Sequence, residues 1–400
     1  TGLDVCEKCT AEGKTIPQDG CPDCDDWRDE KVWCLSGDTL IYAKINKGIT
    51  VTTMQAICED YTPGQIELWD GRTWVKMLGY SESSRGADGQ FRIQLRSGQR
   101  ISCTAHHQWP TQRGNICMDE LREGDVISST TLPPPEIDSA VGIPDLFGWL
   151  IGLYIAEGTR SRDKNGTHCR IQLHGHEKEM QSWAERIGPL VESYGGTIHN
   201  HKYGNKGVLI IESLVIQAII DLYIGGEKAS NKYLKPAIWR KNNGFLREVI
   251  GGYLEGDGHY DEPNCRYRMG FARNYRLADG IRTLAARLNA KLRITTGFSK
   301  YNDKKYPVHK GEWRDTASIC KNGKHSGEII EIRKSNARRF FHIGVDNEDG
   351  LFALASGILT LNSKANPNLG VSIKKKYLEE QVAEAKEMPS KENIVKRLNF

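Results

Sequence analysis

The sequence has no long apolar run. No stretch of its 400 residues approaches the 18 or more apolar residues of a membrane-spanning helix. It begins T-G-L-D-V-C-E-K-C, with neither an initiator Met nor a signal peptide, and it stops abruptly at R-L-N-F. We therefore expect no membrane partner and a cytoplasmic fragment of a longer chain. At 38% hydrophobic residues, the chain can bury several cores and form two to four domains.

A disulfide framework is also missing. The 11 cysteines are an odd number, and four of them form two C-x-x-C pairs. Reactive thiols and a metal site in a reducing cytosol fit this usage better than secreted disulfides. Four thiolates with zinc-ribbon spacing would close a tetrahedral structural site, and the alternative is four reduced, unconnected cysteines. The candidate Zn²⁺ ligands are Cys6, Cys9, Cys21 and Cys24.

Basic residues are scarce at the start of the chain and abundant in its middle. Residues 1–140 carry 14 Lys and Arg against 22 Asp and Glu, whereas residues 141–310 carry 26 against 17. The small net charge of +4 hides this polarity. The middle block is therefore the part suited to a polyanion, with a merely solvated surface as the alternative.

Hydrophobic periodicity divides the chain into five parts. Period-two runs such as F-R-I-Q-L-R-S-G-Q-R-I-S-C-T predict a strand-rich region over residues 34–140. Strand patterning resumes at G-E-I-I-E-I-R, and we expect residues 311–362 to complete the same all-β domain. Between them, residues 141–310 contain two similar helical runs about one hundred positions apart, each followed by a basic strand-like segment. This predicts a tandem α/β repeat, with residues 1–33 and 363–400 as small flanking segments.

Nucleophilic side chains mark both boundaries of the strand-rich region. Cys34 opens C-L-S-G-D-T-L, and Asn362-Ser363 follow G-I-L-T-L. Deleting Cys34 to Asn362 joins D-D-W-R-D-E-K-V-W to S-K-A-N-P-N-L-G, which reads as one uninterrupted globular sequence. Acyl transfer onto a side chain needs a nucleophile beside the scissile carbonyl, a proton acceptor and an oxyanion stabiliser. The boundaries thus carry the side chains for cutting and rejoining the chain.

These motifs, with T-x-x-H between them, resemble those of an intein, whose splicing domain has the all-β, horseshoe-like Hint fold. The resemblance implies that Cys34 attacks the carbonyl of Trp33 and forms a thioester. It also implies that Thr104 and His107 polarise this scissile amide. His106 is a competing assignment that the spacing disfavours.

The same resemblance assigns the later steps to the other boundary. Ser363 Oγ would accept the acyl chain as an ester, and Asn362 would cyclise to a succinimide and release the intein. The ester would then rearrange to a peptide bond.

The match departs from the family next to Asn362. Inteins usually carry His before the terminal Asn, and this chain has Leu361. A second His expected about a dozen positions earlier falls near Gly350. In the preceding strand motif, R-F-F-H-I-G-V-D places His342 at the acidic position, so His342 is the candidate proton donor for Asn362 cyclisation.

The central repeats resemble the two dodecapeptide motifs of LAGLIDADG homing endonucleases. The matching runs are L-I-G-L-Y-I-A-E-G and I-G-G-Y-L-E-G-D-G, which end in Glu157 and Asp257; alignment on the terminal D-G favours Asp257 over Glu255. Small residues would let the two helices pack backbone to backbone. These residues are Gly148, Gly152, Gly251 and Gly252.

Carboxylates at two helix C-termini oppose the helix dipoles and call for compensation by a cation. The resemblance implies Mg²⁺ held by Glu157 and Asp257 for hydrolysis of each strand of double-stranded DNA at a long asymmetric site. Nearby lysines would assist: Lys232 or Lys235 before the second motif, and Lys304 or Lys305 in the second repeat. We take Lys235 and Lys305 as the candidates, in a monomeric protein.

The flanking segments resemble the large terminase subunit of tailed phages over about 70 residues, which would place the chain in a bacterial host cell. These segments contain neither a Walker motif nor a nuclease acid cluster. Two alternatives to a bifunctional intein stay open. One is an endonuclease on a splicing-impaired scaffold, and the other is a zinc-containing terminase fragment without activity.

Overall fold

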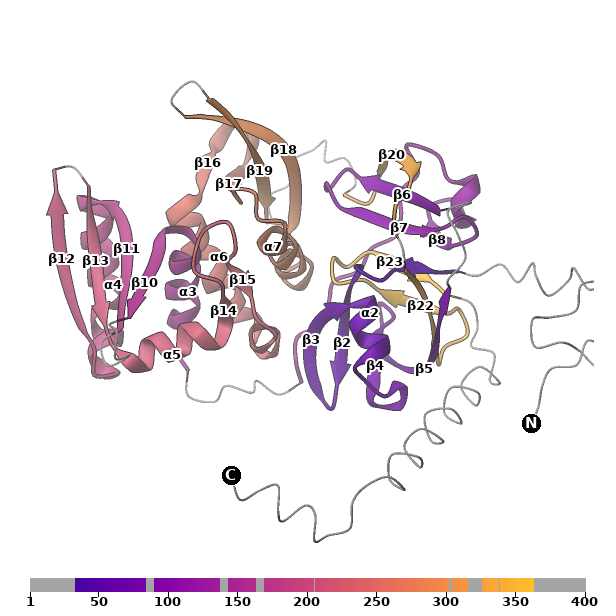
Figure 1. The fold of residues 1–400 in the computed structure, drawn as a ribbon, viewed down its shortest axis with the longest axis horizontal. Helices are drawn as coiled ribbons and strands as arrows, with labels where there is room; N and C mark the ends of the chain where they lie inside the picture. Colours follow the sequence, from indigo (N-terminus) through magenta and orange to yellow (C-terminus); the bar gives the residue numbers. More distant parts are fainter. Residues whose placement is uncertain are drawn as a thin grey trace, which may run out of the picture.

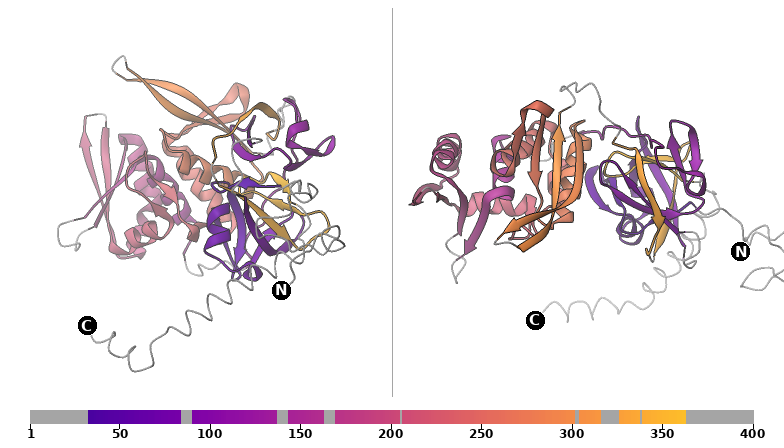
Figure 2. Two further views of the ribbon diagram at one scale, coloured as in Figure 1. Left: turned by 45° about the vertical axis from the view of Figure 1, so that its right-hand side comes forward. Right: turned by 90° about the horizontal axis from the view of Figure 1, so that it is seen from above.

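A computed structural model describes residues 33–83, 90–136, 143–162, 169–204, 206–301, 304–315, 326–337 and 339–362. The four candidate zinc ligands and Ser363 lie outside these ranges. The described residues form two units that lie side by side (Figure 1; Figure 2). Within them, no helix is long and apolar enough to cross a membrane.

The first unit, here called the β unit, comprises the described residues within 33–136 and 326–362. Its main sheet is curled and has nine strands in the order β20-β6-β7-β1-β21-β5-β4-β2-β3. Segments from both sides of the insertion therefore share one sheet. Its elements are β1 (Leu35–Ser36), β2 (Leu40–Ile45), β3 (Gly48–Thr53), α2 (Met54–Glu59), η2 (Pro63–Gln65), β4 (Ile66–Trp69), β5 (Trp74–Ser83), β6 (Gln90–Leu95), β7 (Arg100–Thr104), β8 (Gln108–Thr111), β9 (Gly114–Cys117), η3 (Met118–Glu120), β20 (Ile329–Lys334), β21 (Phe340–Val345), β22 (Leu351–Ala353) and β23 (Leu359–Leu361).

Strand β21 is buried along its whole length because it lies between β1 and β5. Leu35 pairs with Phe341 on one side, and Ile343 pairs with Tyr80 on the other. On its other edge β1 pairs with β7, where Leu35 lies opposite Cys103. The sheet thus brings the start of the unit, β7 and β21 together.

The second unit, here called the α/β unit, comprises the described residues within 143–315 and repeats one arrangement twice. Each half has a four-stranded antiparallel sheet, in the orders β10-β11-β13-β12 and β16-β17-β19-β18. The two orders are equivalent, as the tandem pattern in the sequence predicts. The elements are α3 (Leu146–Glu157), β10 (Gly158–Arg162), β11 (Cys169–His176), α4 (Glu177–Ser193), β12 (Thr197–Tyr203), β13 (Lys206–Glu212), α5 (Leu214–Tyr223), β14 (Ile224–Gly225), β15 (Tyr233–Leu234), η4 (Pro236–Arg240), α6 (Asn243–Asp257), β16 (His259–Asp261), η5 (Glu262–Asn264), β17 (Arg266–Gly270), α7 (Tyr275–Arg287), β18 (Lys291–Tyr301) and β19 (Lys304–Arg314).

Helices α3 and α6 pack against each other at the centre of the α/β unit. A Cβ on Gly152 would lie 1.9 Å from the carbonyl oxygen of Val249, and one on Gly252 would lie 2.0 Å from that of Trp149. Only glycine permits this separation, because neither backbone carbonyl can move aside. Gly251 differs from the expectation, since a Cβ there would meet open space.

A buried arginine joins the two units. Arg287, the last residue of α7, is 1% exposed and donates from Nη1 to the hydroxyl of Tyr42 at 2.9 Å. The Tyr42 hydroxyl in turn donates to the carbonyl of Pro133 at 2.7 Å. Leu132 of the β unit is also buried, and its N–H donates to the carbonyl of Ala286. The interface is therefore a continuation of the core.

The expected boundary after residue 310 falls inside β19. This strand runs on to Arg314, which pairs with Lys291 of β18. The alternation in the sequence continues across residue 310, so the pattern alone could not separate the two units there.

Candidate functional site

Both sides of the Trp33–Cys34 peptide group have polar partners. The N–H of Cys34 donates to Thr104 Oγ1 at 3.1 Å, and the N–H of Thr104 donates to the carbonyl of Cys34 at 3.0 Å. On the other side, Nδ1 of His342 lies 3.2 Å from the carbonyl oxygen of Trp33 and donates to it in the Nδ1–H tautomer. This contact places His342 at the upstream junction, whereas the sequence assigned it to Asn362.

His107 is buried next to the same peptide group. Burial lowers the pKa of His107 to about 3, and the backbone of Trp33 acts in the opposite direction. Its ring packs edge-on against Trp109, and its Nε2 lies 2.7 Å from Thr360 Oγ1. His106, the competing assignment, is exposed and lies 3.9 Å from Asp119. The structure therefore brings His107 to the junction.

Thr360 is a residue that sequence reasoning did not identify. It lies on β23 and is fully buried, two positions before Asn362. Its hydrogen bond with His107 connects the upstream junction with the strand that leads to the downstream one. Nothing in the sequence pattern pairs these residues, because 253 positions separate them.

The thiol of Cys34 is fully buried, which raises its pKa to about 12. The thiol is therefore protonated at neutral pH, and an acyl transfer requires a proton acceptor as it attacks. His107 is neutral, so one of its ring nitrogens carries a lone pair that can accept this proton during the attack. Cys34 is therefore a buried, protonated thiol that becomes a nucleophile only when a neighbouring group takes its proton.

Asn362 is fully buried at the end of the described chain. Its backbone N–H donates to the carbonyl of Gly350 at 2.8 Å. Gly350 has a φ of +66°, and a Cβ there would lie 1.9 Å from the carbonyl oxygen of Asn362. Gly350, near which a second histidine was expected, thus makes room for this carbonyl. Among the described residues, neither side-chain atom Oδ1 nor Nδ2 of Asn362 has a hydrogen-bond partner.

Glu157 and Asp257 end the two central helices. Burial and then the charge of Asp257 raise the pKa of Glu157 to about 7. Asp257 retains solvent-exposed surface, but the protein packed around its carboxyl group raises its pKa to about 6 by desolvation. The packing of α3 on α6 brings these acids close enough to repel each other.

Glu255 has a different environment. Its carboxylate accepts from Trp149 Nε1 at 2.8 Å and from Trp183 Nε1 at 3.1 Å. Arg186 also donates to it and lies over the Trp149 ring. Glu255 therefore links α6 to α3 and α4 through hydrogen bonds. Because its carboxylate is occupied by these bonds, Asp257 is the better candidate for the acid of the second motif.

The two lysine candidates before the second motif differ in position. Lys232 is 1% exposed, and its Nζ donates to the carbonyls of Tyr154 and Gly158, each at 2.6 Å. Burial lowers its pKa to about 8, while the charges of Asp257 and Glu157 oppose this shift. Lys235 instead donates to the carbonyl of Asp221 at 2.5 Å. Lys232 is thus the lysine that interacts with both acids.

In the second repeat, Lys305 lies opposite Lys300, toward the far end of the β18–β19 hairpin. Lys310, on the same strand, lines a pocket of about 610 Å³ together with Asp257 and Arg268. Sequence reasoning missed Lys310, since a single basic residue on a strand carries no signal of its direction.

Two carboxylates fit a magnesium ion that completes its coordination with water and phosphate oxygens. Across the part of the chain that the structure describes, no three His, Cys, Asp or Glu side chains gather into a larger metal site. Among the described residues, Glu157 and Asp257 could hold such an ion because the charge of Asp257 acts on the carboxyl group of Glu157.

No family model matches the chain. Among curated proteins, it is 22% identical over 238 residues to DNA-directed RNA polymerase subunit Rpo1C of Methanocaldococcus jannaschii, covering 50% of this chain and 26% of that protein. It is 24% identical over 255 residues to an iron–sulfur cluster assembly SufBD family protein of Mycobacterium tuberculosis, covering 60% and 29%. The chain thus spans under a third of the length of these relatives.

Among solved structures, the homing endonuclease I-DmoI is similar over 42% of this chain and 82% of its own, with a TM-score of 0.32 and 15% identity. The gp41-1 intein is similar over 24% of this chain and 67% of its own, with a TM-score of 0.20 and 19% identity. A homing endonuclease and an intein are therefore partial structural neighbours of the chain.

Proposed function

We propose that the chain is a self-splicing intein precursor that excises residues 34–362 and joins Trp33 to Ser363. The observation that carries this proposal is the Trp33–Cys34 peptide group, with Thr104 at its nitrogen and His342 at its carbonyl oxygen. Donors at the carbonyl oxygen stabilise the charge that develops when a nucleophile attacks.

In the first step, Cys34 Sγ attacks the carbonyl carbon of Trp33. The C–N bond breaks, and the thiol proton is transferred to the nitrogen of Cys34, with His107 as the neutral base and acid that carries it. The product is a thioester between Trp33 and Cys34. The hydrogen bond from His342 supports the tetrahedral intermediate.

In the later steps, Ser363 Oγ attacks the thioester and releases the Cys34 thiol. The Nδ2 of Asn362 then attacks its own main-chain carbonyl carbon and breaks the bond to Ser363, whose freed amine takes over the acyl group. The buried Asn362 side chain, with no hydrogen-bond partner among the described residues, is free for this attack. The flanking residues 1–33 and 363–400 are the segments that become joined.

An expression gel tests splicing. The unsubstituted chain should yield a 329-residue product, Cys34 to Asn362, and a 71-residue ligated product, and Cys34→Ala should abolish both. His106→Ala is the matched control, because His106 is exposed and should leave splicing intact. Persistence of full-length chain, identical in Cys34→Ala, would show that the proposal is wrong.

A second candidate is an endonuclease on a splicing-impaired scaffold. Leu361 in place of histidine, with Gly350 next to the Asn362 carbonyl, favours it, because no described imidazole is hydrogen-bonded to the Asn362 side chain. Cleavage at Trp33–Cys34 without ligation would be its signature on the same gel.

We further propose that the α/β unit is a site-specific endonuclease for double-stranded DNA. Two observations support this proposal. Glu157 and Asp257 occupy equivalent positions at the ends of α3 and α6 in the two repeats, and the residues around them carry more positive than negative charge. Glu157 and Asp257 would hold Mg²⁺, which supplies Lewis-acid stabilisation for phosphodiester hydrolysis when bound. Lys232 would position these carboxylates through the C-terminal turn of α3.

Cleavage of a duplex encoding residues 1–33 joined directly to 363–400 tests this activity. Asp257→Asn should abolish Mg²⁺-dependent double-strand cutting, whereas Glu185→Gln, on the exposed face of α4, changes the same charge and should leave it intact. An unsubstituted chain that leaves this duplex uncut would favour a degenerate nuclease.

Residues 1–33 and 363–400 would belong to the host protein from which the intein is excised. We propose a phage terminase fragment in the bacterial cytoplasm, with Zn²⁺ held by Cys6, Cys9, Cys21 and Cys24, and a monomeric chain. Metal analysis should find one zinc per chain, lost when Cys21 and Cys24 are replaced by serine. A chain without zinc would contradict the site while leaving splicing unaffected.

A further inference from the structure

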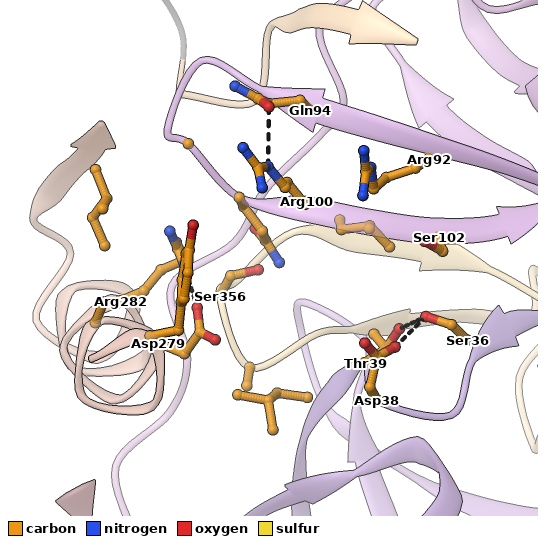
Figure 3. A pocket seen from close by; sticks show the side chains of 18 of the residues that line it. Ser36, Asp38, Thr39, Arg92, Gln94, Arg100, Ser102, Asp279, Arg282 and Ser356 are labelled. Atoms are coloured by element: carbon orange, nitrogen blue, oxygen red, sulfur yellow. Dashed lines mark hydrogen bonds and ion pairs between the residues drawn. The ribbon is translucent and has the colours of Figure 1, made fainter. Parts of the chain in front are cut away.

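A polar cavity of about 640 Å³ lies between the two units (Figure 3). Its walls are the β6–β7 hairpin and the β1–β2 turn of the β unit, with α7 and β18 of the α/β unit. Thr295 and His309 line this cavity and also the pocket that contains Asp257. The two pockets therefore adjoin each other at these two residues.

One face of the β6–β7 hairpin is directed into the cavity. Arg92 pairs with Ser102 and Gln94 pairs with Arg100, so these four side chains share a face. The residues on the opposite face fill the core of the β unit; they are Ile93, Leu95, Ile101 and Cys103. Figure 3 shows Arg92 and Arg100 on neighbouring strands, where Arg100 Nε donates to Gln94 Oε1 at 3.1 Å.

The cavity carries an excess of positive charge. Its arginines are Arg92, Arg96, Arg100, Arg282 and Arg293, and its acids are Asp38 and Asp279. Arg96 pairs with Glu328, and Arg282 pairs with Asp279. Among the described residues, no ion pair joins a carboxylate to Arg92, Arg100 or Arg293. Three guanidinium groups are therefore available to an anion.

The hairpin is fixed against the sheet of the α/β unit. The N–H of Ile294 on β18 donates to the carbonyl of Ser97 at 2.8 Å. Gly98 has a φ of +80°, and a Cβ there would lie 1.8 Å from the Ile294 carbonyl oxygen. This close contact holds Arg92 and Arg100 beside the strand that leads to the Asp257 pocket.

We propose that the β6–β7 hairpin of the β unit is a DNA-binding element in which Arg92 and Arg100 hold phosphates flanking the cleavage site. This inference rests on the proposed endonuclease function, because only then does the adjacent pocket with Asp257 bind the phosphodiester that is cleaved. Guanidinium groups bind phosphate oxygens through paired hydrogen bonds, and a row of them beside a cleavage site fits a duplex backbone better than a small anion. The splicing unit thereby takes part in target binding.

The test uses the full chain carrying Cys34→Ala and Asn362→Ala, so that it stays intact, with Ca²⁺ in place of Mg²⁺ so that DNA is bound and not cut. Binding to the duplex encoding residues 14–33 joined to 363–382 is measured by fluorescence anisotropy at several salt concentrations. Arg92→Gln with Arg100→Gln should weaken binding about 10- to 100-fold and reduce the salt slope by about 2. Arg92→Lys with Arg100→Lys should keep the slope.

The matched control is Arg72→Gln with Arg122→Gln, which removes the same charge from exposed positions of the β unit outside the cavity. Equal unfolding midpoints for both double variants show that the fold is intact. If the Arg92→Gln, Arg100→Gln variant binds the duplex as tightly as the control variant does, the hairpin proposal is wrong, and the endonuclease proposal is unaffected. If the parent chain neither binds this duplex in Ca²⁺ nor cuts it in Mg²⁺, both proposals are wrong. The cavity would instead bind RNA if the parent chain bound an RNA duplex of the same sequence more tightly than the DNA, and if Arg92→Gln with Arg100→Gln weakened only the binding of RNA.

Discussion

Nδ1 of His342 lies 3.2 Å from the carbonyl oxygen of Trp33, although 309 positions separate the two residues. The contact exists because β21 lies between β1 and β5 in the sheet. An imidazole at this carbonyl is in position to stabilise the tetrahedral intermediate of the acyl transfer that we propose as the first step.

His342→Ala should therefore slow cleavage at Trp33–Cys34 by about 10²- to 10³-fold, the usual effect of removing one oxyanion donor. Thiol-induced cleavage of the Asn362→Ala chain measures this step alone. Release of residues 363–400 from the Cys34→Ala chain measures Asn362 cyclisation, which should change little. The reverse result, slow cyclisation with normal upstream cleavage, would return His342 to the role that the sequence suggested.

His107 should make the fold sensitive to acid. Burial lowers its pKa to about 3, below its ordinary 6.5, so between these values the unfolded chain binds a proton and the folded chain does not. This difference does not reduce the free energy of unfolding above about pH 6.5. Below that pH the free energy of unfolding falls, and at pH 4.5 it is lower by about 2 to 3 kcal/mol than at pH 7. Urea unfolding of the Cys34→Ala, Asn362→Ala chain at pH 7 and 4.5 measures the loss. Adding His107→Gln should reduce it, and an equal loss would contradict the buried neutral imidazole.

Gly152→Ala should destabilise the α/β unit by about 3 kcal/mol, because the new methyl group would meet the Val249 carbonyl oxygen at 1.9 Å. Gly251→Ala is the control on the partner helix. Its methyl group meets open space, so it should stabilise the helix by up to about 1 kcal/mol. Thermal unfolding compares the two variants. Similar shifts in both would mean that α3 and α6 do not pack through Gly152.

Lys232→Met should lower the rate of DNA cleavage about 100-fold, because Lys232 interacts with both acids at the helix ends. Lys235→Met should have a small effect, since its Nζ binds the Asp221 carbonyl instead. Duplex binding in Ca²⁺ and the unfolding midpoint separate a role at the acids from a general loss of structure. A cleavage defect in Lys235→Met alone would favour the assignment made from the sequence.

The position of Cys34 directly before a strand and the positions of Glu157 and Asp257 at helix ends could be predicted from the sequence, because each residue stands in a short motif with fixed spacing. Cys34 opens its motif, and Glu157 and Asp257 end theirs, so each position follows from local order alone. Thr104 and His107 also stand in a short motif, and the pairing of β7 with β1 places that motif beside Cys34.

Contacts between distant strands could not be predicted in the same way. The direction of His342 depends on the register between β21 and its neighbours, which no local pattern specifies. Lys232 and Lys235 lie three residues apart in a segment without regular helix or long strand, so their directions had no periodicity to follow. The approach of Gly98 to Ile294 likewise depends on how the two units pack.

The buried contact between Arg287 and Tyr42 means that the insertion cannot simply be removed. A shortened chain that fused residue 136 to residue 326 would uncover Tyr42 and Leu132, which the α/β unit now covers. Loss of the insertion during evolution would then need new polar residues on that patch. If the chain splices as we propose, the precursor therefore needs the fold of the α/β unit to cover this patch, whether or not Glu157 and Asp257 are retained.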